Sequence, residues 1–238
     1  MIDFVQSLFS LVQTWGGLLL RGTLETCRLF AITLVLELAV ALIMGLARLA
    51  RFAPLRIFAN IFVEIFRGVS SYVTLFWLYF ALPLIGISLG APEAAVLALA
   101  LVHGAYASEY VRSTLLAVPK GQIDAATALN MTRFQRMRYV VFPQAIVAMM
   151  PLFGNDAIML LKATSLASLI AVQELTEAGV AINGTTYSAN AFQVFTILLI
   201  IYFILSQIVA LTMRLIEARV GYWKSPSRVS SVKMLVPQ

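Results

Sequence analysis

The chain has 238 residues, of which 61% are hydrophobic and 12% charged, whereas a soluble domain has roughly 45–50% apolar and about 25% charged residues. These fractions exclude a soluble globular domain and an intrinsically disordered chain. The net charge of +6, from 17 basic and 11 acidic residues, is tested below against membrane topology. With Cys27 and His103 as its only Cys and His, the chain offers neither a disulfide framework nor a Cys/His metal cluster.

The first 17 residues have the pattern of an amphipathic helix. Phe4, Leu8, Leu11 and Trp15 recur at helical spacing, which is typical of a helix lying in the membrane interface. A secretory signal peptide is excluded because the segment lacks a basic start and carries Asp3. We therefore treat 1–17 as an N-terminal interfacial helix.

Five later segments are long and apolar enough to cross a bilayer, which takes about 20 residues. The predicted spans are 24–47, 69–88, 94–116, 143–162 and 191–213. The apolar segment 164–176 is too short and suits a re-entrant or packed helix. The sequence thus predicts an all-α integral membrane protein, with a transmembrane domain over 18–222 and a polar tail over 223–238.

The basic residues report on orientation. The loops after the first and third spans and the C-terminal tail hold 13 of the 17 basic residues. With five spans these three segments lie on one side, and cytoplasmic flanks collect Lys and Arg. We therefore expect the N-terminus outside and the C-terminus in the cytoplasm, with no need for a nucleic-acid partner.

The loop over 117–142 is too elaborate for a simple connection. Good helix formers run from Gln122 to Leu129, and Asn130 follows as a residue that tolerates the left-handed conformation of a helix C-terminus. Pro143 then suits the first turn of the next span. Two interpretations fit: a helical linker lying on the bilayer, or a docking element for a cytoplasmic partner.

The spacing in this loop resembles the cytoplasmic motif of binding-protein-dependent ABC importer permeases. That motif has Glu-Ala-Ala, three residues, Gly, nine residues and an aliphatic residue, and after one more residue it closes with an apolar-Pro pair. The corresponding residues here are Asp124-Ala125-Ala126, Asn130, Val140 and Phe142-Pro143. Asp for Glu keeps the charge, and Asn for Gly keeps the turn.

Three further segments resemble the polar amino acid subfamily of these permeases, the histidine, glutamine and glutamate type. They are Phe66-Arg67-Gly68 with the apolar run after it, 105–126, and 142–176. The Thr-Pro that usually follows the Arg-Gly pair is here Val69-Ser70.

The resemblance implies a bacterial inner-membrane protein that works in an assembly. Its partners would be two ATP-binding cassette subunits inside, a second permease copy or paralogue, and a solute-binding protein outside. The chain has no GxxxxGK[ST] phosphate loop, so we expect no enzyme activity and no bound cofactor or metal, with ATP and Mg²⁺ on the partner ATPase. The ATPase contact is expected at Lys120, Gly121, Asp124, Ala125, Ala126, Asn130, Arg133 and Pro143.

Polar groups inside the spans are candidates for the solute pathway, because a charge at the bilayer centre costs about 2.5–3.5 kcal/mol. On a helical wheel Asn155, Asp156, Met159 and Lys162 share about one third of the circumference. They offer an anion, a cation and an amide, the groups that a zwitterionic amino acid needs. Hydroxyls of Thr164 and Ser165 could extend the site. The alternative is that Asp156 and Lys162 pair with other spans.

The remaining intramembrane charges also have two interpretations. Glu109 could contact the solute or pair with Arg112, one helical turn away. Glu64 and Arg67 could pair in the same way, or that pair could set a helix break at Gly68. Glu37 has no local partner and either meets another helix or lines a cavity.

Two other functions compete with import of a polar amino acid. A permease of the same family could carry an opine or an ectoine-like compatible solute. A stand-alone channel or secondary carrier is the alternative class, and five spans without an internal repeat fit an inverted-repeat carrier poorly. The sequence leaves open whether the permease is a homodimer or a heterodimer.

Overall fold

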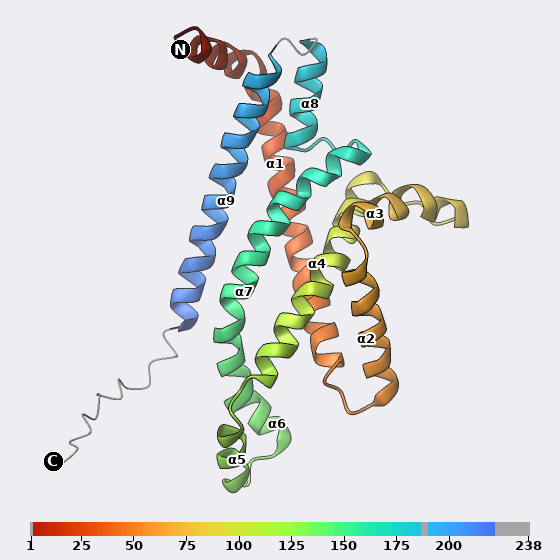
Figure 1. The fold of residues 1–238 in the computed structure, drawn as a ribbon, viewed down its shortest axis with the longest axis vertical. Coiled ribbons are helices and arrows are strands. Elements are labelled where there is room, and N and C mark those ends of the chain that lie inside the picture. Colours follow the sequence, from red (N-terminus) through yellow and green to blue (C-terminus); the bar gives the residue numbers. More distant parts are fainter. Residues whose placement is uncertain (1, 187–189, 222–238) are drawn as a thin grey trace, which may run out of the picture.

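The structure is an elongated bundle of helices. The computed structural model describes residues 2–186 and 190–221, and every regular element within those ranges is helical, which confirms the predicted fold class. The long helices α1 (Ile2–Ala47), α4 (Ala91–Leu116), α7 (Phe142–Ala163) and α9 (Ala191–Gly221) form the body of the bundle (Figure 1). The shorter helices are α2 (Ala53–Gly68), α3 (Ser71–Phe76), α5 (Lys120–Ala128), α6 (Arg133–Arg136) and α8 (Leu175–Thr185). The predicted tail over 223–238 lies outside the described residues.

Four stretches of helix are long and apolar enough to cross a membrane, namely Leu8–Ala47, Ala91–Leu116, Arg133–Ile170 and Ala191–Val220. A bent pair, Ala53–Gly68 and Ser71–Ile85, is a fifth if both parts belong to one span. The predicted spans 94–116, 143–162 and 191–213 coincide closely with α4, α7 and α9. The segment after α7 forms a 3₁₀ helix over Thr164–Ile170 and then α8.

The predicted span over 69–88 is not a span by itself, because its helical part, Ser71–Ile85, qualifies only together with the preceding helix Ala53–Gly68. The two parts of the bent pair meet at 103°, because Val69 and Ser70 are extended between them. The break follows Gly68, which was one of the two alternatives for the Glu64 and Arg67 pair. Helix α4 fastens this bend, since the Tyr106 hydroxyl donates to the Arg67 carbonyl at 2.9 Å and the Arg67 guanidinium lies over the Tyr106 ring. The alternative pairing of Arg67 with Glu64 is not among the ion pairs of the described residues.

Helix α1 runs from Ile2 to Ala47 without interruption, so no break separates the predicted interfacial helix from the first span. Its first turns curve away from the bundle axis (Figure 1). Leu11 and Leu19 are buried against Leu175, Ile182 and other apolar residues of α8 and α9. Part of the N-terminal segment therefore packs on protein.

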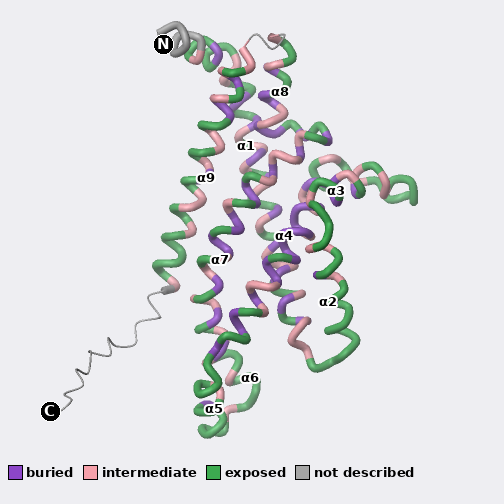
Figure 2. The backbone as a smooth tube through the Cα atoms, viewed as in Figure 1, coloured by how far each residue is buried: buried purple, intermediate pink, exposed green. Residues whose placement is uncertain are grey.

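Helix α4 is the centre of the bundle. In the apolar 18-residue stretch of α4, 67% of the residues are buried, against 22% in the corresponding stretch of α9. Figure 2 shows the same contrast. Glycines let α1 approach α4 closely. A Cβ added to Gly104 would lie 2.7 Å from the Val40 Cβ, and one added to Gly45 would lie 2.7 Å from the Val111 Cβ. Small residues at crossing points are the usual basis of helix packing in membranes.

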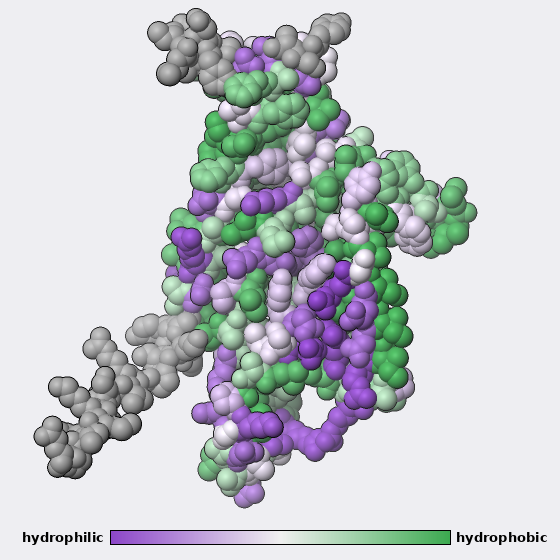
Figure 3. All heavy atoms as spheres, in the orientation of Figure 1, coloured by the Kyte–Doolittle hydropathy of each residue, from purple (hydrophilic) through white to green (hydrophobic). Residues whose placement is uncertain are grey.

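The surface separates into apolar and polar regions. In Figure 3 hydrophobic side chains cover the outer edge of α2, whereas hydrophilic side chains gather at the end of the molecule near α5 and α6. The exposed apolar residues of α2 include Ile57, Phe58, Ile61 and Ile65. Such a face suits contact with lipid tails or another membrane subunit.

Candidate functional site

The segment between α4 and α7 is a compact helical hairpin that projects from one end of the bundle (Figure 1). Helix α5 begins at Lys120, directly after Pro119. Asn130 has φ 54°, the left-handed conformation predicted for it, and its N–H donates to the Thr127 carbonyl at 2.9 Å. Pro143 lies in the first turn of α7. The hairpin is therefore joined to α4 and α7 by very short connections.

Side-chain hydrogen bonds hold the two arms of the hairpin together. Thr132 and Gln135 form a reciprocal capping box at the start of α6, and the Arg136 guanidinium donates to the Thr127 hydroxyl at 2.6 Å. This capping box was not predicted, although Thr followed three residues later by Gln is its recognisable sequence signal. The capping box and the hydrogen bond between Arg136 and Thr127 thus fix the two arms relative to each other.

One face of the hairpin is open to a partner. Asp124 and Ala125 are exposed, as are Lys120, Gly121 and Arg133 of the predicted contact set, whereas Ala126 is buried against the protein. Leu129 and Phe134 are 72% and 70% exposed. Large apolar side chains exposed on an otherwise polar hairpin are typical of an interaction surface.

The predicted solute face on α7 is only partly assembled. Asn155, Met159 and Lys162 are exposed along one side of the helix, but Asp156 is buried and points towards α1 and α4. Asp156 and Lys162 therefore do not share one opening. The helix continues through Pro151, which lies inside α7.

The hydroxyls at the end of α7 are engaged within the chain. The Thr164 side chain is buried and donates to the Leu161 carbonyl at 2.7 Å. The Ser165 hydroxyl donates to the Lys162 carbonyl at 2.7 Å. Thr164 is fully buried and therefore closed to a solute, whereas Ser165 is partly exposed and keeps lone pairs that can accept a hydrogen bond.

Glu109 is held by two arginines. Its carboxylate accepts from Arg112 Nη2 at 2.6 Å and from Arg48 Nη1 at 2.6 Å. Arg48 also donates to Asn60 Oδ1 at 2.9 Å. The interpretation of Glu109 as a partner of Arg112 is confirmed, and Arg48 adds a contact between helices that local spacing could not reveal.

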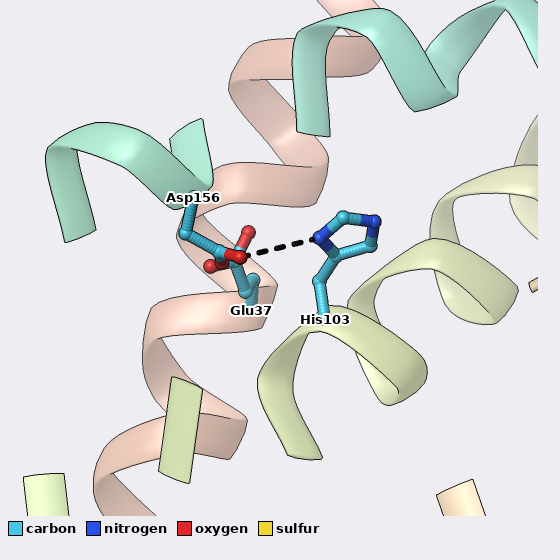
Figure 4. Close-up of side chains that lie close together, drawn as sticks. All are labelled: Glu37, His103 and Asp156. Carbon is cyan, nitrogen blue, oxygen red and sulfur yellow. Dashed lines mark ion pairs between the residues drawn. The ribbon is translucent and has the colours of Figure 1, made fainter. Parts of the chain in front are cut away.

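A second polar cluster lies in the middle of the bundle. Glu37 of α1, His103 of α4 and Asp156 of α7 come together there, and each offers an atom within 4.8 Å of the others (Figure 4). His103 Nδ1 lies 3.6 Å from Asp156 Oδ1. Glu37 therefore meets other helices, one of the two alternatives left by the sequence.

A third polar cluster ties α1 to α8 and α9. Glu174 is fully buried, and it accepts from the Glu177 N–H at 3.0 Å, the Tyr202 hydroxyl at 2.8 Å and the Thr26 hydroxyl at 3.2 Å. Burial raises the pKa of the Glu174 carboxyl above its ordinary value, although these hydrogen bonds oppose the shift. This network was not anticipated from the sequence.

Known proteins are similar to this chain in sequence. A probable amino-acid ABC transporter permease protein of Sinorhizobium fredii is 38% identical over 218 residues, covering 89% of this chain and 91% of the relative. The L-cystine transport system permease protein of Bacillus subtilis is 34% identical over 210 residues, covering 87% and 88%.

Solved structures agree with these relatives. The crystal structure of an amino acid ABC transporter with histidines contains a chain that is 31% identical and superposes with a TM-score of 0.82, covering 89% of this chain and 97% of that one. The MetNI methionine ABC transporter in inward-facing conformations shares the fold, with 23% identity and a TM-score of 0.69 over 85% and 96% of the two chains. Residues 37–222 match the binding-protein-dependent transport system inner membrane component. The chain therefore belongs to this family, the permease subunits of ABC importers, whose ATPase is a separate subunit.

Proposed function

We propose that this permease forms the membrane pathway for polar amino acids or related zwitterionic solutes, and that its α5–α6 hairpin receives the movement of the ATPase. The observation that carries the proposal is the rigid hairpin set directly between α4 and α7. Because both flanking helices reach the centre of the bundle, a push on the hairpin tilts them together. Family membership and amino-acid-transporting relatives support the solute class.

The partners follow from this arrangement. Two ATP-binding cassette subunits dock at the hairpins of two permease copies or paralogues, and a solute-binding protein docks at the opposite end of the bundle. ATP and Mg²⁺ bind to the ATPase subunits. The contact on this chain centres on Asp124, Ala125 and Asn130, with Leu129 and Phe134 as apolar anchors.

The proposed orientation places the hairpin in the cytoplasm and the start of α1 outside. The loop after α1, with Arg48 and Arg51, and the first turn of α2, with Arg56, lie at the same end of the bundle as the hairpin (Figure 1). The other end carries Glu174 and Glu177 near the start of α8. This distribution supports the positive-inside assignment.

The proposed solute contacts lie on the exposed side of α7. Asn155, Met159 and Lys162 present an amide, a thioether and an ammonium along one face, so Lys162 would receive the solute carboxylate. Replacement Lys162→Gln should raise the KM of uptake, while Gln207→Leu, on the exposed surface of α9, should leave it unchanged. Equal KM values for the two variants would remove Lys162 from the pathway.

The docking role is tested by Asp124→Arg in proteoliposomes that contain the complete transporter. We expect ATP-driven uptake to be lost, because the reversed charge lies on the exposed contact face, while the assembled chain still inserts in the membrane. The matched control is Glu217→Arg, an exposed carboxylate on α9 outside the hairpin. Uptake by Asp124→Arg at the rate of this control would refute the proposal and would favour a stand-alone carrier.

A further inference from the structure

The central cluster of Glu37, His103 and Asp156 has no part in the proposed docking or in the exposed face of α7. The three side chains come from α1, α4 and α7 and are 0%, 9% and 3% exposed. Side chains with so little exposed surface are closed to a solute as large as an amino acid. Whatever balances their charge is therefore small.

The cluster is short of hydrogen bonds. Both carboxylate oxygens of Glu37 and Oδ2 of Asp156 are buried and accept no hydrogen bond from an N–H or hydroxyl group of the described residues. Within the chain, the two carboxyl groups can only share a proton with each other. Glu174 is equally buried but has partners for both of its oxygens. Uncompensated carboxylates in a bundle of apolar helices are costly, so a bound cation would relieve the cluster of Glu37 and Asp156.

The distances suit coordination better than direct pairing. His103 Nδ1 and Asp156 Oδ1 are 3.6 Å apart, which is too long for a good hydrogen bond. Around an ion with ligands at about 2.0–2.2 Å, neighbouring ligands of a tetrahedron lie roughly 3.3–3.6 Å apart. One atom from each of the three residues lies within 4.8 Å of the others, so a small movement of Glu37 would complete three corners.

The donor set selects the class of ion. One neutral imidazole and two carboxylates neutralise a divalent cation, and imidazole with carboxylate suits first-row transition metals better than Ca²⁺ or Mg²⁺. We propose that Glu37, His103 and Asp156 bind one divalent transition-metal ion of the Zn²⁺ class, with a water molecule as a further ligand. The ion would join α1, α4 and α7. This proposal departs from the sequence-based expectation of no metal on this chain.

The test measures Zn²⁺ binding to the full chain in lipid nanodiscs, purified through a tag that contains no histidine and stripped with a chelator. We expect one Zn²⁺ per chain by elemental analysis and titration. Because His103 is the only histidine in the sequence, its ¹⁵N imidazole resonances should shift on addition of Zn²⁺ without overlap. Co²⁺ in place of Zn²⁺ should give the visible absorption of a site with few ligands.

Variants separate this site from adventitious binding. His103→Ala and Asp156→Asn should each weaken Zn²⁺ binding by at least about tenfold. Glu174→Gln, at a buried carboxylate outside the cluster, should retain it. Absence of stoichiometric Zn²⁺ on the wild-type chain, or binding that His103→Ala leaves unchanged, would overturn the proposal, and the wild-type result holds even if a variant fails to fold. Neither result bears on the hairpin, because the docking experiment uses different residues and a different readout.

Discussion

Replacement of Glu109 by Gln should destabilise the chain without changing its affinity for solute. Glu109 accepts hydrogen bonds from both Arg48 and Arg112, so the substitution weakens two ion pairs at once. The Arg48 side chain is 10% exposed and the Arg112 side chain 33% exposed. The two losses should therefore differ in size.

Breaking a buried ion pair costs about 3–5 kcal/mol when the remaining charge has no partner. Arg48 keeps its hydrogen bond to Asn60 Oδ1 at 2.9 Å, and we accordingly expect about 2–3 kcal/mol for this half. The more exposed Arg112 half adds about 0.5–1 kcal/mol. The free energy of unfolding should fall by roughly 3 kcal/mol in total.

The matched control is Glu25→Gln, because Glu25 also pairs with an arginine three residues away on the same helix. That pair is longer, at 3.4 Å, and its arginine, Arg28, is 70% exposed, so the loss should stay below about 1 kcal/mol. Reversible unfolding in mixed micelles gives the free energies, and uptake in proteoliposomes gives the KM. A Glu109→Gln protein as stable as the control, with a raised KM, would refute the structural role and restore Glu109 to the solute pathway.

Three further changes test the hairpin, the packing of α1 on α4 and the buried carboxyl of Glu174. Asn130→Gly should preserve ATP-driven uptake. Asn130→Val should destabilise the hairpin by about 1–2 kcal/mol, because residue 130 has a φ of 54°. Limited proteolysis of the hairpin measures the difference between the two variants, and equal cleavage would contradict the prediction. Gly45→Ala should destabilise the chain by about 1–3 kcal/mol, because its Cβ would lie 2.7 Å from Val111 Cβ. Gly17→Ala, where nothing lies within 4 Å, is the control, and equal unfolding free energies would be the contrary result. Since burial raises the pKa of Glu174, the folded state keeps its proton longer than the unfolded chain, so the free energy of unfolding should fall as pH rises from the ordinary Glu pKa to the raised one. Glu174→Gln should flatten this slope, and an unchanged pH profile would contradict the assignment.

The sequence predicted well those features that depend on neighbouring residues. The helix before Asn130 and its left-handed cap follow from local propensity, and the structure has both. Pro143 does not begin the span, because the helix already starts at Arg133, after the Thr132 cap, and continues through α7. The pairing of Glu109 with Arg112 is equally local, because one helical turn separates them.

Features that depend on tertiary contact could not be predicted in this way. Apolar composition predicts a helix over 69–88 but carries no information on the 103° bend, which depends on extended Val69 and Ser70 and on the contact of Arg67 with Tyr106. The helical wheel placed Asp156 at the margin of the solute face. It could not show that Glu37 and His103, on two other helices, lie opposite the Asp156 side chain.

Helix α1 shows why the central cluster differs from the other buried polar groups. Thr26, Glu37 and Arg48 are spaced eleven residues apart, so at 3.6 residues per turn they lie on nearly the same side of the helix, about 16 Å from one to the next. Thr26 donates to Glu174 at one level, and Arg48 donates to Glu109 at the other. Both of these carboxylates are satisfied by further protein donors.

Glu37 is the middle member of this row on α1. Of the three, it alone meets a second carboxylate, and the described contacts include no arginine, lysine or hydroxyl that balances it. Polar groups that merely joined α1 to its neighbours would be expected to resemble the two end clusters. The acidic excess lies near the middle of a row that extends about 33 Å, close to the roughly 30 Å thickness of the hydrocarbon core. At that depth water is scarce, so a divalent cation bound between the two carboxylates would balance them, which distinguishes this cluster from the two ion-pair and hydrogen-bond clusters that hold the ends of the bundle.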